Sequence, residues 1–245
     1  MTRLLLTIRY DGTAYHGWQV QPNGVTVQQC VQDAIEKLTG TRSDVIGCSR
    51  TDAGVHADMF CCVFDTESPL RGEKMALALN AHLPKDIAVS DCKEVSADFH
   101  PRYDAKGKRY EYTIWNGRQR NPFYENCALH VNVPLDEKKL NVCAKQFCGT
   151  HDYRAFCSAG SDVEDTVRTV RDCGVVRNGD VITVYVEADG FLYNMVRILV
   201  GTLLDIAAGR LPENALETAV HSGNREDAGT TAPPKGLCLK QVFYD

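Results

Sequence analysis

The chain has 245 residues, of which 44% are hydrophobic and 24% are charged. This composition is that of an ordinary globular protein, with material for one large domain or two small ones. The net charge of −5 by itself argues against a nucleic-acid partner. Eleven cysteines are present, but no Cys-x-x-Cys pair and no Cys/His set with zinc spacing. We therefore predict no metal or redox centre, and reduced thiols in a cytoplasmic protein with no secretory leader.

The first half of the chain alternates strand and helix patterns. Strands are predicted over residues 3–10, 45–48, 59–64 and 87–95, and a helix over residues 72–82. Another helix is predicted to begin after Thr26, in a capping box with Gln29, and to stop at Gly40. The resulting order β-α-β-β-α-β is the ferredoxin-like pattern.

The second half repeats this pattern less clearly. Strands are predicted over residues 108–115, 169–177, 181–188 and 237–243, with Asn178-Gly179 as a hairpin turn, and helices over residues 136–147, 192–208 and 213–221. The sequence thus predicts an α+β fold of two ferredoxin-like halves, residues 1–104 and 105–245. The two halves are expected to be related by a pseudo-twofold axis, with a central antiparallel sheet and helices on one side.

The most apolar stretch of the chain, residues 191–208, is predicted to form a core helix. Four polar residues interrupt it, namely Asn194, Arg197, Thr202 and Asp205, and they argue against a membrane span. A buried charge is costly unless it is paired, so Arg197 either meets a carboxylate or extends to water from the edge of the helix. We expect Phe191 and Tyr193 to lie in the core.

A single carboxylate, Asp52, lies in a glycine-containing loop between two apolar runs, within Ser49–Ala57 (SRTDAGVHA). Arg50 precedes it by two residues. A rigid loop between buried strands suits a nucleophile or a general base. A bare Asp-x-Gly is more often an Asx-turn that only bonds its own backbone. From this loop alone, both interpretations stay open.

A basic segment follows the expected join between the halves. Between His100 and Arg120 the cations are Arg102, Lys106, Lys108, Arg109, Arg118 and Arg120, against Asp104 and Glu111 only. Phosphate binding requires a basic stripe rather than a basic protein. A solvated strand edge protected by charge is the alternative. Interleaved aromatic residues, among them Tyr103 and Tyr110, favour RNA because they can stack on exposed bases.

Five segments together resemble the tRNA pseudouridine synthase A family. They are the SRTDAGVHA loop and residues 10–19 (YDGTAYHGWQ), 99–112 (FHPRYDAKGKRYEY), 191–197 (FLYNMVR) and 231–237 (TAPPKGL), and the five lie in the family's order across nearly the whole chain. The sequence departs from the family pattern at Pro101, at Ile198 and over residues 153–157.

This resemblance implies an isomerase that converts uridine to pseudouridine in the anticodon stem-loop of tRNA, without a metal or other cofactor. It implies that Asp52 is catalytic and forms a salt bridge with Arg197, and that Tyr110 packs against the target base. It further implies that Arg50 fills the gap left by the flipped base or holds a phosphate, and that Leu237 lines the pocket. A homodimer is expected to bind tRNA through the basic segment, with help from Arg42, Arg168 and Arg171.

Three other classes of protein are alternatives to this interpretation. A non-catalytic tRNA-binding protein on the same fold is the main alternative. A carboxylate glycosidase would need a second acidic residue beside Asp52, and the nearest, Asp58, lies at the start of a strand. A purely structural protein would not need the basic segment.

Overall fold

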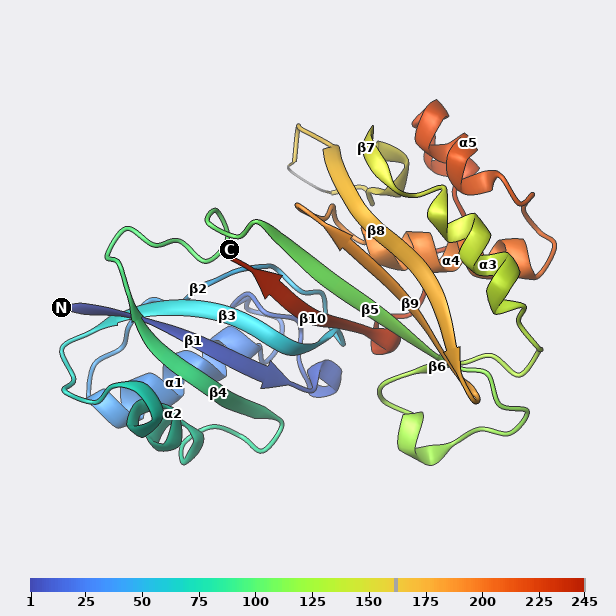
Figure 1. The fold of residues 1–245 in the computed structure, drawn as a ribbon. Coiled ribbons are helices and arrows are strands. Elements are labelled where there is room, and N and C mark those ends of the chain that lie inside the picture. Colours follow the sequence, from blue (N-terminus) through green and yellow to red (C-terminus); the bar gives the residue numbers. More distant parts are fainter. Residues whose placement is uncertain (161–162, 245) are drawn as a thin grey trace. The chain divides into compact units, whose positions relative to one another are not determined.

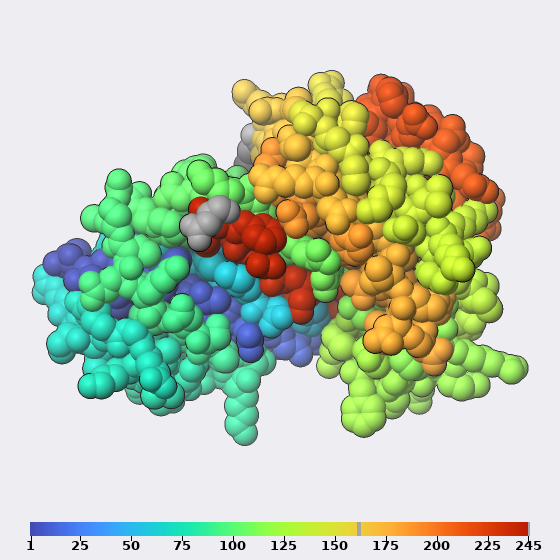
Figure 2. Space-filling model, viewed as in Figure 1, coloured from blue at the N-terminus to red at the C-terminus, as the bar shows by residue number. Residues whose placement is uncertain are grey.

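The computed structural model describes residues 1–160 and 163–244. It divides into two compact units: Met1–Lys106 with Cys238–Asp245, and Gly107–Leu237. The expected division placed everything after residue 104 in the second half. In the structure, the last strand β10 (Leu237–Phe243) runs parallel to β3 (His56–Thr66), so the end of the chain belongs with the first unit (Figures 1 and 2).

The first unit has the predicted β-α-β-β-α-β order. Its strands are β1 (Thr2–Tyr10), β2 (Ile46–Gly47), β3 and β4 (Ile87–Val95), and the sheet order is β4-β1-β3. All these neighbours are antiparallel, and β2 pairs with β3 where Gly47 faces Cys62. β10 pairs with the other end of β3, where Leu239 faces Ala57. Two strands thus share one edge of β3.

Helices α1 (Val27–Thr39) and α2 (Gly72–Asn80) lie on one face of this sheet (Figure 1). The predicted cap at Thr26 is confirmed, because its side chain accepts a hydrogen bond from the backbone N–H of Gln29 at 3.4 Å. Gly40 ends α1 with a φ of 75°, a left-handed conformation that favours glycine. Local sequence signals therefore set both ends of this helix.

The second unit contains β5 (Gly107–Trp115), β6 (Leu129–His130), β7 (Gly149–Asp152), β8 (Val167–Asn178) and β9 (Val181–Ala188). The order β5-β9-β8-β7 is antiparallel, and β6 runs parallel to β5. Helix α3 (Glu137–Lys145) packs on β8 and on α4 (Met195–Ala207), and α4 also contacts β5. Helix α5 (Ala215–Ser222) packs against α4. Both units are therefore α+β.

Three local features differ from the prediction. The long helix begins at Met195 rather than at residue 192, because Asn194 adopts a left-handed conformation with a φ of 62°. The β8–β9 turn is centred on Gly179 and Asp180, since Asn178 already pairs with Val181. Tyr193 is 46% exposed and so lies outside the core. Among the described residues, no helix combines the length and apolar character that crossing a membrane would require.

Candidate active site

Asp52 lies in the loop between β2 and β3, and it is half-buried. Its backbone carbonyl accepts a hydrogen bond from the N–H of Val55 at 3.1 Å, which closes a four-residue turn. Gly54, at the third position of this turn, has a φ of 77°. The backbone thus sets the position of Asp52.

A second segment of the first unit, residues 10–18, supports this loop. The Tyr10 hydroxyl lies 2.8 Å from the Thr51 hydroxyl oxygen, and the Trp18 N–H donates to the Thr51 carbonyl at 3.1 Å. The Gly54 N–H donates to the Tyr15 carbonyl at 3.3 Å. Two motifs that are separate in the sequence therefore form one structural element, with residues on both sides of Asp52 held by the 10–18 segment.

Two glycines allow this close approach. A Cβ on Gly12 would lie 2.0 Å from the Val55 carbonyl oxygen. A Cβ on Gly17, whose φ is 81°, would lie 2.5 Å from the Thr51 carbonyl oxygen. Such contacts are far inside van der Waals distance, so a side chain at either position would force the Asp52 loop to move.

Asp11 and His56 form a further contact between the 10–18 segment and the chain next to the Asp52 loop. The Gly12 N–H donates to Nδ1 of His56 at 3.0 Å, and Oδ1 of Asp11 lies 3.1 Å from the same nitrogen. Burial raises the pKa of Asp11, but hydrogen bonds from Thr13 and the nearby imidazole outweigh it, and the net pKa is lowered. Gly12 and Asp11 thus meet His56 at the start of β3, directly after the Asp52 loop.

Arg197 lies in the first turn of α4 in the second unit, and it is half-buried. Its Nε donates to the Ala232 carbonyl at 2.8 Å, and its Nη1 donates to Oδ1 of Asn194 at 2.6 Å. Asn194 in turn donates to Ser158 Oγ at 2.9 Å. The predicted helix over residues 192–208 includes Asn194 as a polar interruption. Its residue type was the signal for a later start, because asparagine tolerates left-handed backbone better than most residues.

Tyr110 and Leu237 also lie in the second unit. Tyr110 is on β5, is 6% exposed, and meets Phe191 edge-on with ring centroids 4.9 Å apart. Leu237 is buried at the start of β10. The Tyr112 hydroxyl donates to the Pro233 carbonyl at 2.8 Å. Since Pro233 lies shortly before Leu237 in the chain, this hydrogen bond anchors the loop that leads to Leu237.

The expected site residues thus fall into two groups. Asp52 and the exposed Arg50 belong to the first unit, and Tyr110, Arg197 and Leu237 belong to the second. The Asp52–Arg197 salt bridge would join the two units and stays a prediction.

The basic segment is less uniform than its sequence. Four of its cations are exposed: Arg102, Lys106, Arg118 and Arg120. Lys108 is only 8% exposed, and Arg109 binds Glu111 at 3.0 Å while its guanidinium lies 4.6 Å from the centre of the Tyr185 ring. In the sequence, Arg102 and Lys106 precede β5, and Arg118 and Arg120 follow it. Four of the six cations in this segment are therefore accessible at the surface of their units.

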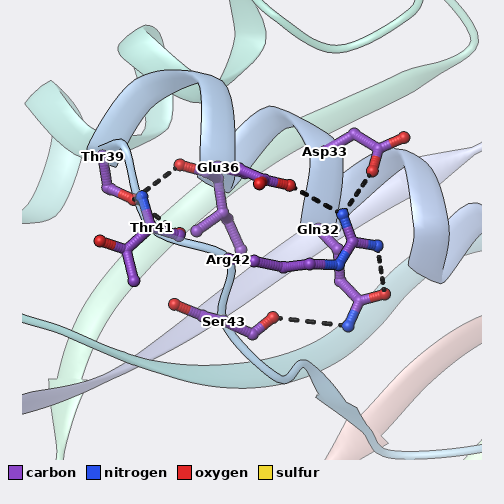
Figure 3. Close-up of polar contacts among 8 residues, drawn as sticks. Gln32, Asp33, Glu36, Thr39, Thr41, Arg42 and Ser43 are labelled. Carbon is purple, nitrogen blue, oxygen red and sulfur yellow. Dashed lines mark hydrogen bonds and ion pairs between the residues drawn. The ribbon is translucent and has the colours of Figure 1, made fainter.

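Arg42 lies in an acidic environment (Figure 3). Its Nη1 is 2.8 Å from Asp33 and 2.9 Å from Glu36, both on α1, and its Nη2 donates to Gln32 at 3.4 Å. Two carboxylates around one guanidinium leave a local excess of negative charge, which is unfavourable for a phosphate group. Arg42 is therefore a poor candidate for RNA contact.

Within residues 1–160 and 163–244, no three or more His, Cys, Asp or Glu side chains are grouped so that they could hold a metal ion. All eleven cysteines are free thiols.

A family model for tRNA pseudouridine synthases matches residues 6–104 and 143–245. The chain is 45% identical to tRNA pseudouridine synthase A 2 of Clostridium perfringens strain 13 over 244 residues, which is 100% of both chains. It is equally 45% identical, with the same coverage, to tRNA pseudouridine synthase A of Thermoanaerobacter sp. strain X514. A solved Cbf5-Nop10-Gar1 complex gives a TM-score of 0.40 at 11% identity over 96% of this chain and 57% of that one, a likeness too distant to support a conclusion.

The chain belongs to the tRNA pseudouridine synthase family. It is an isomerase that forms pseudouridine from uridine in tRNA.

Proposed function

We propose that Asp52 is the carboxylate with which this enzyme isomerises uridines in the anticodon stem-loop of tRNA, just 3′ of the anticodon. The reaction breaks the N1–C1′ bond of the nucleoside and forms a C5–C1′ bond, while the hydrogen on C5 moves to N1 by way of solvent. No atoms are gained or lost overall and nothing is oxidised. A carboxylate that adds to C6, attacks C1′ or removes the C2′ proton is therefore sufficient in principle.

One observation carries this proposal. Asp52 is half-buried on a turn whose flanking residues are hydrogen-bonded to the separate 10–18 segment. A catalytic group is effective only when its surroundings hold it in the productive geometry. An ordinary Asx-turn aspartate would not need a second segment built around it.

The second unit would supply the other groups. Arg197, oriented by Ala232 and Asn194, would pair with Asp52 and keep it ionised next to a partly dry base. Tyr110 would pack against the uracil, and Leu237 would line the same pocket. Arg50 would occupy the space left by the flipped nucleotide, whose extrusion costs a few kcal/mol and is cheapest near a loop.

tRNA would contact the exposed cations Arg102, Lys106, Arg118 and Arg120, together with the half-buried Arg109, while the buried Lys108 would act only through its charge. A homodimer would let one tRNA span two subunits. The free thiols and the tRNA substrate both support a location in the cytoplasm.

The decisive experiment is tritium release from tRNA labelled at C5 of uracil, since C5 loses its hydrogen in the reaction. The Asp52→Asn variant should release no tritium but still fold and bind tRNA. Asp58→Asn is the matched control, because Asp58 lies six residues away and binds Lys240 at 2.7 Å on the surface of the same unit. Asp58→Asn should retain near-normal turnover.

Two outcomes would count against the proposal. Turnover by the Asp52→Asn variant would exclude Asp52 as the catalytic group. A wild-type protein that binds tRNA and releases no tritium would favour the alternative, a non-catalytic tRNA-binding protein on the same fold. Mapping pseudouridines in cellular tRNA with and without the protein would test the anticodon-arm assignment.

A further inference from the structure

One face of α4 carries three residues that meet a single loop. Arg197, Gly201 and Asp205 follow each other at intervals of four, so they lie in one row along the helix. The loop of residues 229–232 runs beside this row in the opposite direction. Its Ala232 meets Arg197, and its Thr230 meets Gly201 and Asp205.

The contact at the Arg197 end is reciprocal. Nε of Arg197 donates to the Ala232 carbonyl at 2.8 Å, and the Ala232 N–H donates to the Arg197 carbonyl at 3.0 Å. Any movement of Ala232 would therefore change where the guanidinium points.

The other end of the loop is anchored by two side chains of α4. Oδ2 of Asp205 accepts a hydrogen bond from the Thr230 N–H at 2.9 Å, and Oγ1 of Thr202 accepts one from the Gly229 N–H at 2.8 Å. The Asp205 side chain is only 6% exposed. Its Oδ1 faces Arg210, which is largely exposed and balances the charge. Asp205 thus keeps one oxygen for the loop.

Between the two ends the loop has no room to slide. A Cβ on Gly201 would lie 1.7 Å from the Thr230 carbonyl oxygen, so the loop backbone rests directly on the helix backbone. The Thr230 backbone N–H donates directly to the Asp205 carboxylate, which fixes this end of the loop. Loss of that bond would leave Thr230 less constrained at a point two helical turns, or about 12 Å, from Arg197.

We propose that Asp205 is a positioning residue that orients Arg197 through the 229–232 loop. It touches no substrate. The proposal rests on the role proposed above for Arg197. Asp205 holds Thr230, the loop carries this constraint to Ala232, and the Ala232 carbonyl holds Nε of Arg197. A displacement of about 1 Å at a catalytic group can cost about 100-fold in rate.

The test is steady-state kinetics of tritium release by Asp205→Ala and Asp205→Asn. We expect Asp205→Ala to lower kcat by about 10- to 100-fold and to leave KM for tRNA within about twofold, because no tRNA-binding cation is touched. Asp205→Asn keeps an oxygen that can accept from the Thr230 N–H and should recover most of the activity. Thermal unfolding of each variant must show that it is folded at the assay temperature.

A double-mutant cycle separates positioning from loss of stability. If Asp205 acts through Arg197, Asp205→Ala should cost no further activity in an Arg197→Ala background. The control is Val175→Ala on β8, a buried truncation whose effect on activity should be the same in both backgrounds.

The outcomes distinguish the two proposals. If Arg197→Ala retains full activity, the proposed role of Arg197 is wrong. If Arg197→Ala is slow and Asp205→Ala slows it again by the same factor as in the wild type, the link from Asp205 to Arg197 is wrong. Full activity of Asp205→Ala would also overturn the link.

Discussion

Replacing Gly17 by alanine should displace the Asp52 loop. The φ of 81° costs an alanine about 1–2 kcal/mol of folding stability. In addition, the new Cβ would lie 2.5 Å from the Thr51 carbonyl oxygen, whereas ordinary contacts begin at 3.4 Å. Relief of this contact requires a shift of 0.9 Å, the difference between these two distances. A shift of this size next to Asp52 should lower kcat by about 100-fold.

Gly40 provides a matched control for this experiment. Its φ is 75°, but a Cβ there would meet no atom within 4 Å. Gly40→Ala should therefore lose stability through the same backbone strain and keep the kcat of the wild type. Tritium release gives kcat, and urea unfolding gives the stability of both variants. A Gly17→Ala enzyme with a kcat within twofold of the wild type would refute the reasoning, as would an equal loss of kcat in Gly40→Ala.

Three further predictions concern base stacking, acid stability and tRNA binding. Tyr110→Ala should lose about 1–3 kcal/mol of base stacking, visible as a fall in kcat/KM for tRNA, while Tyr110→Phe keeps most of it. Burial opposes ionisation of Asp205, yet hydrogen bonds from the loop and from Arg210, together with the charge of Arg210, lower the pKa of Asp205. The ionised Asp205 therefore stabilises the fold above about pH 4, and this stabilisation is lost as the pH falls through the lowered pKa. Urea unfolding between pH 7 and pH 3 should therefore show a shallower acid loss for Asp205→Asn than for the wild type. In a filter-binding assay, Arg118→Ala should weaken tRNA binding and reduce the slope of log K against log [salt] by about one unit. Arg42→Ala should change neither quantity, because carboxylates already neutralise Arg42.

Much of the local structure could be predicted because its causes are local. The helix α1 starts at the Thr26 cap and stops at Gly40, and β4 and β10 have the predicted bounds. Each of these depends on hydrogen bonds, backbone preferences or side-chain periodicity within a few residues. The sequence also identifies the candidate carboxylate, since Asp52 is the only acidic residue in its loop.

Other features depend on contacts between distant segments. Lys108 looked like part of a basic surface and is buried, because it shares a face of β5 with Tyr110 and Tyr112. Alternation along the strand assigns it to that face, and only the packing of the sheet shows that the face is buried. Asn194 looked like a simple interruption and instead precedes α4 in a left-handed conformation, which no periodicity within a short window indicates.

The sequence by itself determined the alternation of strands and helices, the family, and Asp52 as the candidate for catalysis. Only the tertiary structure decided that β10 lies beside β3, that the 10–18 segment supports the Asp52 loop, and that the 229–232 loop lies along α4. The physical reason is the range of the interactions. A cap or a turn is determined by neighbouring residues. The docking of two loops depends instead on long-range packing, and on glycines that are required only because another backbone lies against them.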